Sequence, residues 1–354
     1  MRKWVVNGLV VIVSLVVALA ACEAILSQLP AAFAPDLTRI HPERRYELRP
    51  GHESRSYGAP VRINSRGLRD GEREVCLRAG CVRIGVFGDS MTFGPSVALE
   101  ETFTHLLETQ LRRDAGIEAQ VFNFGVPSYN TRMEYLQMRD VIDTYKLDVV
   151  ILQYTAANDA VVMDQDELSG ALNRRPVLRA LKDFFRHLHL YHLASRYYFV
   201  LRRDSANAEG PALDEFAAGL RSHRALYRPD APGWREVSAA FRDIATLART
   251  KGASLVLAIH SSTARITRNP ADDPYREISE AVAAGASVAG IGHRLLLDDC
   301  LRGYADDPTV LWVRPDDSHF SPLAHREVAR CLFDYLSTNR LVPELSPPPR
   351  SGGG

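Results

Sequence analysis

Apolar and polar positions alternate along most of the chain in the way expected of strands followed by helices. Five buried strands are predicted by short apolar, β-branched runs at 81–87, 119–124, 148–154, 253–260 and 309–313. Helices are predicted where apolar residues recur at helical spacing, over 100–113, 131–146, 234–251, 275–289 and 322–336. This alternation predicts an α/β fold, a three-layer sandwich whose central, mostly parallel five-stranded sheet carries helices on both faces.

The N-terminus has a different pattern. An apolar run from Trp4 to Leu26 follows two basic residues, and as a helix it would be about 34 Å long, enough to cross a membrane. The basic start predicts that the rest of the chain lies outside the cytoplasm. Residues 1–27 therefore read as a signal anchor or, because the segment ending at Cys22 resembles a lipobox, as a lipoprotein signal. A cleaved secretory signal ending near Ala20 is a third alternative.

Three further segments interrupt or flank the alternating pattern, which spans 81–340. Residues 28–80 are rich in Pro, Arg and Gly with little periodicity, and predict a stalk or an irregular N-terminal cover. A basic, aromatic helical insertion at 161–233 follows the end of a strand, where loops build binding sites in parallel sheets. It is interpreted either as a lid or as a packing or partner-docking element. The tail, 341–354, is predicted to be disordered.

The overall composition narrows the function classes. It is typical of a globular protein, with 46% hydrophobic and 24% charged residues. The formal net charge is zero, which argues against nucleic-acid binding, because phosphate neutralisation requires an excess of Lys and Arg. No set of Cys and His residues has metal-site spacing, so neither a metal nor another cofactor is expected. The oligomeric state is left open.

The five cysteines agree with export. Cys76 and Cys81 flank a short turn between two strand-like pieces, so a disulfide between them is expected in an oxidising compartment. Cys300 and Cys331 are left open, with free, buried thiols as one alternative. Cys22 is the odd one out, at a position that a lipid or a bilayer would cover.

Residues suited to ester chemistry stand at the junctions that follow the predicted strands. Ser90 follows the first strand, Gly125 the second and Asn158 the third, while Asp316 and His319 follow the last. Each could belong to an ordinary loop, since turns favour such residues for reasons unrelated to catalysis. Together they supply a nucleophile, a base, an orienting carboxylate and oxyanion donors, which are the parts that a serine esterase requires.

In their order and spacing these motifs resemble the blocks of the SGNH (GDSL) hydrolases, and the likeness covers about 83–336 apart from the insertion. The segment 62–70 also resembles one that precedes this domain in membrane-anchored bacterial members. The resemblance implies a flavodoxin-like sandwich and serine ester chemistry. Two positions depart from it. Ala156 stands where the family has Gly, which can alter the oxyanion pocket, and Met91 replaces Leu with little change of volume.

The resemblance implies one role for each site residue. Ser90 is the nucleophile, His319 its base and Asp316 the carboxylate that orients His319. The oxyanion donors are the backbone N–H groups of Ser90 and Gly125 and the side-chain amide of Asn158.

The residues themselves leave three competitors. His325, in the following helix, could replace His319 as the base, and Asp317 could replace Asp316 as the orienting carboxylate. His260, at the end of the fourth strand, is well placed to line the pocket.

Three functions remain open at this point. The leading hypothesis is an extracytoplasmic serine esterase that hydrolyses carboxylic esters, with short acyl groups on a carbohydrate as the expected substrate. An O-acyltransferase acting on envelope or secreted polysaccharide would use the same triad. A non-catalytic envelope-assembly protein on a hydrolase scaffold is the third alternative, and the complete set of site residues argues against it.

Overall fold

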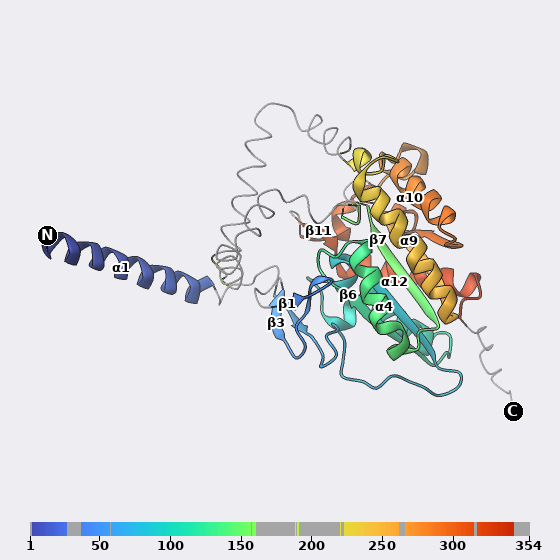
Figure 1. Cartoon of the computed structure of the whole chain (residues 1–354). Helices are drawn as coiled ribbons and strands as arrows, with labels where there is room; N and C mark the ends of the chain where they lie inside the picture. Colours follow the sequence, from blue (N-terminus) through green and yellow to red (C-terminus); the bar gives the residue numbers. More distant parts are fainter. Residues whose placement is uncertain are drawn as a thin grey trace.

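The computed structural model describes residues 2–26, 37–56, 58–156, 158–160, 188, 190, 220, 223–261, 266–314 and 317–342. Most of the predicted insertion and the last twelve residues of the predicted tail, 343–354, lie outside these ranges. The chain begins with one long helix, α1 (Arg2–Leu26) (Figure 1). The other described segments build a sheet with helices on both of its faces.

The sheet has five parallel strands in the order β6-β5-β7-β8-β9. They are β5 (Val82–Gly88), β6 (Ala119–Gly125), β7 (Val149–Thr155), β8 (Ser254–His260) and β9 (His293–Leu296). The predicted fold class is confirmed, and so are four of the five predicted strands. Because all the strands are parallel, their carboxyl ends meet at one edge of the sheet.

The fifth predicted strand, 309–313, was wrong. The edge position belongs to β9, while this segment forms a 3₁₀ turn, η5 (Pro308–Leu311), and β10 (Trp312–Arg314). Asp307 caps the turn by accepting from the Thr309 N–H, and Pro308 opens it, so local capping overrides the β-branched pattern. β10 pairs antiparallel with β11 (Asp317–Phe320) outside the main sheet.

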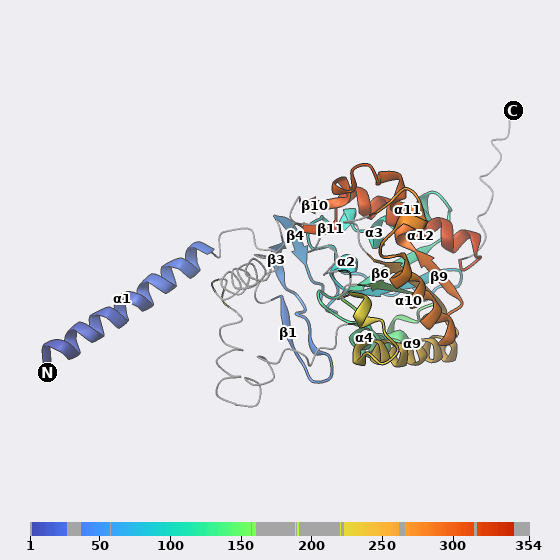
Figure 2. The same cartoon turned by 90° about the horizontal axis from the view of Figure 1, so that it is seen from above.

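Helices cover both faces of the sheet (Figure 2). One face packs against α4 (Thr131–Tyr145), α9 (Pro232–Lys251) and α10 (Arg276–Val288). The other packs against α3 (Phe103–Arg113), α11 (Leu297–Leu301) and α12 (Pro322–Thr338). Buried side chains of β7 alternate between the two cores: Val150 and Leu152 belong to the first, Val149 and Ile151 to the second. Burial on both faces explains why the inner strands appear in the sequence as continuous apolar runs.

The segment predicted as an irregular cover contains two hairpins. These are β1 (Thr38–His41) with β2 (Arg45–Leu48), and β3 (Glu53–Ser56) with β4 (Ala59–Arg62). Leu48, Val61 and Ile63 are buried in one cluster with Phe93 and Tyr129 of the main domain. Four-residue strands are too short to give a periodic signal, which is why the sequence pattern missed them.

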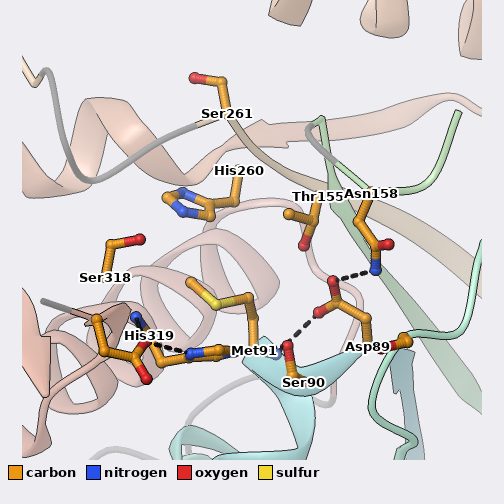
Figure 3. Close-up of a pocket in the computed structure, with 11 residues that line it drawn as sticks. Asp89, Ser90, Met91, Thr155, Asn158, His260, Ser261, Ser318 and His319 are labelled. Atoms are coloured by element: carbon orange, nitrogen blue, oxygen red, sulfur yellow. Dashed lines mark hydrogen bonds and ion pairs between the residues drawn. The ribbon is translucent and has the colours of Figure 1, made fainter. Parts of the chain in front are cut away.

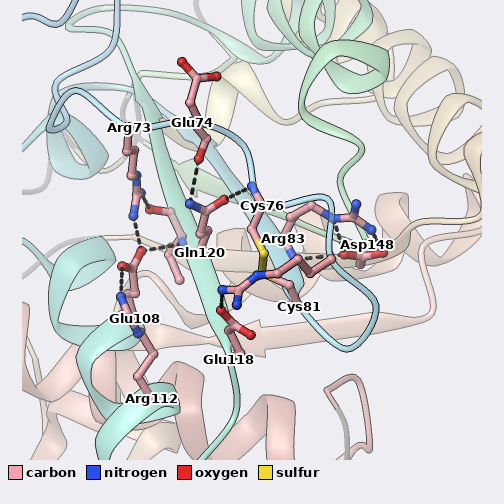
Figure 4. The surroundings of a disulfide bond; sticks show 12 residues. Arg73, Glu74, Cys76, Cys81, Arg83, Glu108, Arg112, Glu118, Gln120 and Asp148 are labelled. Carbon is pink, nitrogen blue, oxygen red and sulfur yellow. Dashed lines mark hydrogen bonds and ion pairs between the residues drawn. A yellow bond between two sulfur atoms is a disulfide. The ribbon is translucent and has the colours of Figure 1, made fainter.

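Two disulfides join described residues. Cys76 pairs with Cys81 across the turn before β5, as expected, with 6.3 Å between the Cα atoms (Figure 4). Cys300 of α11 pairs with Cys331 of α12, with 6.2 Å between the Cα atoms, so the free-thiol alternative for these two is wrong. Both separations lie within the usual range for disulfides. Cys22 is exposed and unpaired.

Within α1, Val6–Leu26 is long and apolar enough to cross a membrane by length and composition, with a mean hydropathy of 2.8. Its apolar side chains are exposed, for example those of Leu9, Val13 and Val16. A signal sequence at an N-terminus has the same properties, so this helix is compatible with a membrane span or a signal peptide.

His325, the competitor of His319, lies in the core between α3 and α12. Its side chain is fully buried, and its Nδ1 accepts the Phe103 N–H at 3.2 Å. Burial, together with the charges of Arg69 and His319, lowers the pKa of His325 to about 3. This histidine is therefore a neutral acceptor that completes the first turn of α3, and it does not line the pocket.

This burial predicts a pH-dependent stability. Between pH values near 6.5 and 3 the unfolded chain binds a proton at this histidine and the folded chain does not, so stability falls as the pH drops. His325→Asn keeps an oxygen acceptor for the Phe103 N–H but cannot titrate. We expect the free energy of unfolding of the wild type to fall relative to that of the variant by about 1.4 kcal/mol per pH unit in this window. Urea unfolding of the full chain in detergent measures this free energy at each pH. Wild-type and variant values that change in parallel with pH would contradict the prediction.

Candidate active site

A pocket of about 310 Å³ opens at the edge where the parallel strands end. It is lined by residues at the ends of β5, β6, β7 and β8 or shortly after them, and by residues of β11. Figure 3 shows the labelled members of this set. The lining residues are Asp89, Ser90, Met91, Ser128, Thr155, Asn158, His260, Ser261, Asp317, Ser318 and His319.

Ser90 and His319 meet in this pocket although 229 positions separate them in the sequence. Ser90 opens the short helix α2 (Ser90–Phe93), directly after β5. Asp89 caps this helix, accepting the Met91 N–H at 2.8 Å. The Nε2 of His319 lies 2.8 Å from the Oγ of Ser90, which is the hydrogen-bond contact that a nucleophile and its base require.

The carboxylate beside His319 is Asp317. Its Oδ1 lies 2.5 Å from the Nδ1 of His319 and also accepts the His319 backbone N–H at 3.1 Å. Both residues belong to β11, and residues two apart on a strand point to the same face. Asp316, the predicted orienting residue, lies outside the described residues. The contact found is therefore the one weighed as the alternative.

Gly125 has a packing role. A Cβ at this position would lie 2.3 Å from the Phe93 backbone nitrogen and 2.7 Å from the Thr92 carbonyl carbon, so only glycine lets α2 approach β6 so closely. The Gly125 N–H donates to Asn123 Oδ1 at 2.9 Å, and Gly125 does not line the pocket. The prediction that Gly125 is an oxyanion donor is therefore not supported by its position.

Ser128 is the residue of this loop that lines the pocket. The Tyr129 N–H donates to the Val126 carbonyl at 3.1 Å, and Ser128 has a φ of 62°. With Pro127 before it, this describes a type II turn, in which the N–H of the third residue points away from the turn. The Ser128 N–H has no hydrogen-bond partner among the described residues. Pro127 was the sequence signal that could have indicated this turn.

Asn158 lines the pocket and links two of its walls. Its amide donates to Asp89 Oδ2 at 2.8 Å and to the Tyr129 carbonyl at 3.1 Å. Ala156, the departure from the family pattern, is buried and is not among the residues with positive φ. The backbone there is one that alanine adopts without strain.

Behind Asp89 lie two further buried acids, Asp159 and Glu134. Asp159 accepts from the Thr131 hydroxyl and the Thr155 N–H, whereas the Glu134 oxygens have no partner among the described residues. Burial raises the pKa of both carboxyl groups well above its ordinary value, and the neighbouring carboxylates raise it further. Both carboxyl groups therefore hold their protons to a higher pH than exposed acids do, which limits the negative charge behind the pocket.

Arg69 holds the other end of α2. Its guanidinium is buried and donates to the carbonyls of Phe93, Gly94 and Val97. Burial lowers the pKa of Arg69 to about 10, so the side chain stays charged at neutral pH. Arg69 lies in the segment 62–70, whose sequence resembles a segment of membrane-anchored family members. Its contact with α2 could not be predicted from the sequence.

No family model matches the chain, and no curated protein matches it. Solved structures do match in fold. TesA is 14% identical over 73% of this chain and 99% of its own, with a TM-score of 0.41. A variant of Axe2, an acetylxylan esterase from Geobacillus stearothermophilus, is 14% identical over 72% of this chain and 94% of its own, with a TM-score of 0.41. A G-D-S-L family protein from Desulfitobacterium hafniense is 15% identical over 72% of this chain and 99% of its own, with a TM-score of 0.38. At such identities the likeness concerns the fold alone.

Proposed function

We propose that the protein is a serine esterase that hydrolyses carboxylic esters through an acyl-enzyme. The observation that carries the proposal is the hydrogen-bonded series of Ser90, His319 and Asp317, with 2.8 Å between Ser90 Oγ and His319 Nε2. A nucleophile, its base and an orienting carboxylate in this order define the serine hydrolase arrangement on unrelated folds. The pocket beside Ser90 leaves room for a small ester.

The chemistry follows from these contacts. His319 takes the proton of Ser90 Oγ as that oxygen attacks the ester carbonyl, and the carbonyl electron pair moves onto its oxygen. Asp317 accepts the Nδ1–H and stabilises the imidazolium. When the tetrahedral intermediate collapses, the C–O bond breaks and His319 gives its proton to the departing alkoxide. Water then attacks the acyl-enzyme with His319 again as base, which releases the acid and restores Ser90.

The developing negative charge needs preorganised donors. The Ser90 N–H stands in the first turn of α2, where backbone N–H groups have no partner within the helix. The Ser128 N–H, on the facing loop, takes the place that the sequence suggested for Gly125. The amide of Asn158 is the third donor of the proposal, and it would share one hydrogen with the Tyr129 carbonyl. Losing one such donor typically costs about 3 kcal/mol in the transition state.

The expected substrates are short acyl groups on a hydroxyl-rich alcohol such as a carbohydrate. Hydroxyl and imidazole side chains border the pocket, among them those of Thr155, His260, Ser261 and Ser318. Such a lining can hydrogen-bond the hydroxyls of a polyol, whereas a long aliphatic chain would displace water from these polar groups without bonding to them.

An extracytoplasmic location is part of the proposal. Two observations support it: the apolar helix Val6–Leu26, preceded by two basic residues, and the two disulfides. Cytosolic thiols are ordinarily kept reduced, so structural disulfides are typical of exported proteins.

The nucleophile is tested directly. Ser90→Ala should abolish cleavage of p-nitrophenyl acetate and labelling by a fluorophosphonate, because no other hydroxyl is bonded to His319 in the described part of the chain. Removing the nucleophile leaves at most about 10³- to 10⁴-fold catalysis over water. Product analysis with an added oligosaccharide separates hydrolysis from acyl transfer. A wild-type protein that neither cleaves the ester nor takes the label would contradict the proposal.

The orienting carboxylate is tested with adjacent variants. Asp317→Asn should lower kcat by about 10⁴-fold, because an amide favours the wrong imidazole tautomer. Asp316→Asn is the matched control and should keep most of the activity. The rates of p-nitrophenyl acetate cleavage by the two variants identify the orienting carboxylate. A large loss of activity in the Asp316 variant alone would assign the orienting role to Asp316.

The location is tested by protease accessibility. In spheroplasts of a bacterial host, added trypsin should degrade the catalytic domain while a cytoplasmic marker protein stays intact, because the basic N-terminus is retained inside. Protection of the domain until the cells are lysed would show that it faces the cytoplasm.

A further inference from the structure

A second histidine–carboxylate pair borders the same pocket. His260 ends β8, and its Nδ1 lies 2.7 Å from Oδ1 of Asp298, which belongs to α11. The side chains are 3% and 6% exposed. The proposed ester chemistry uses neither residue. Figure 3 shows the His260 ring among the lining side chains, separate from His319.

Contacts on two sides fix the orientation of this ring. Asp298 holds Nδ1, and Asp298 is itself fixed because its other oxygen accepts from the backbone N–H of Ser261, at 3.0 Å, and from the Ser261 hydroxyl. The ring also packs on Phe320, with 4.9 Å between the ring centroids. Phe320 directly follows His319, so the two imidazoles are held in fixed relation to each other.

These contacts leave one nitrogen for a ligand. Asp298 takes the hydrogen of Nδ1, as paired carboxylates do, and Nε2 makes no hydrogen bond within the described residues. A neutral His260 can accept a hydrogen bond through Nε2, and a protonated one can donate. A hydroxyl group both donates and accepts, so it fits either state. The Ser90 hydroxyl is already bonded to His319, so it does not occupy Nε2, and a hydroxyl of a substrate in the pocket can bind there.

We propose that His260 Nε2 binds a free hydroxyl on the alcohol part of the ester and thereby selects esters of polyols over esters of simple alcohols. The inference rests on the proposed esterase function and names its substrate class. His260 acts as a binding residue in it, and Asp298 positions His260.

The test compares two acetate esters with the same three-carbon alcohol skeleton. Glycerol 1-monoacetate carries free hydroxyls next to the ester, and propyl acetate carries none. We expect the wild-type protein to have the higher kcat/KM on the monoacetate. His260→Asn keeps a polar group near the position of Nδ1 for Asp298 but has nothing at the position of Nε2. This variant should lower the ratio of the two kcat/KM values by about tenfold, the upper range for one neutral hydrogen bond.

Two further variants separate binding from structure. His260→Gln places an amide near the position of Nε2 and should restore part of the ratio. His293→Asn changes a half-buried histidine of β9 that does not line the pocket, and it should leave the ratio at the wild-type value. A purely structural role of His260 would lower both rates together and leave the ratio unmoved, which would overturn the inference.

The rates of the wild-type protein on the two esters also test the inference. Equal kcat/KM values on the two esters would overturn the selection of polyols, whatever the variants do and whether or not they fold. Cleavage of propyl acetate and fluorophosphonate labelling of Ser90 would in that case still support the esterase. If the wild-type protein cleaves neither ester and takes no label, the esterase proposal itself fails, and the inference fails with it.

Discussion

Close packing of the α2 backbone on β6 is the constraint on which the candidate site depends. The space that a side chain at Gly125 would need is filled by the backbone of Thr92 and Phe93, and the Asn123 amide donates to the Thr92 carbonyl at 3.0 Å. Arg69 holds the carbonyls at the far end of the same helix. A four-residue helix has too few internal hydrogen bonds to be stable alone. The scaffold therefore fixes the position of the nucleophile, which α2 carries at its first residue.

The parallel sheet explains why so much of this arrangement could be predicted. Strands buried on both faces give continuous apolar runs, so four strands and the helices between them were evident from the pattern. Residues just after parallel strands converge at one edge, so the sequence could bring Ser90 and Asn158 together without a structure. His319 was reached differently, through its motif after the last predicted strand. That strand was misplaced, but the motif does not depend on the strand, and the structure brings His319 to Ser90.

The remaining features depend on contacts that a linear pattern does not encode. β9 is half-buried along its whole length, so it lacked the apolar signal of the inner strands. Ser128 lines the pocket and Gly125 does not, because a turn with a positive φ at Ser128 follows β6. A serine gives no sequence signal for a positive φ. The contact of Asp317 with His319 follows from the alternation of side chains along β11, and that strand was not predicted at all. Each of these features belongs to a short element whose conformation is set by its tertiary neighbours.

The disulfide between Cys300 and Cys331 joins the two helices behind the pocket. α11 carries Asp298, the partner of His260, and α12 begins three residues after His319. The bridge closes a segment of 31 residues, and a loop of that size contributes on the order of 3 to 4 kcal/mol in the chain-entropy account. One covalent bond thus ties together the supports of both imidazoles. With both thiols reduced, the same pocket would be held by packing and hydrogen bonds alone, so oxidation of this pair would act as a maturation step for the geometry of the site.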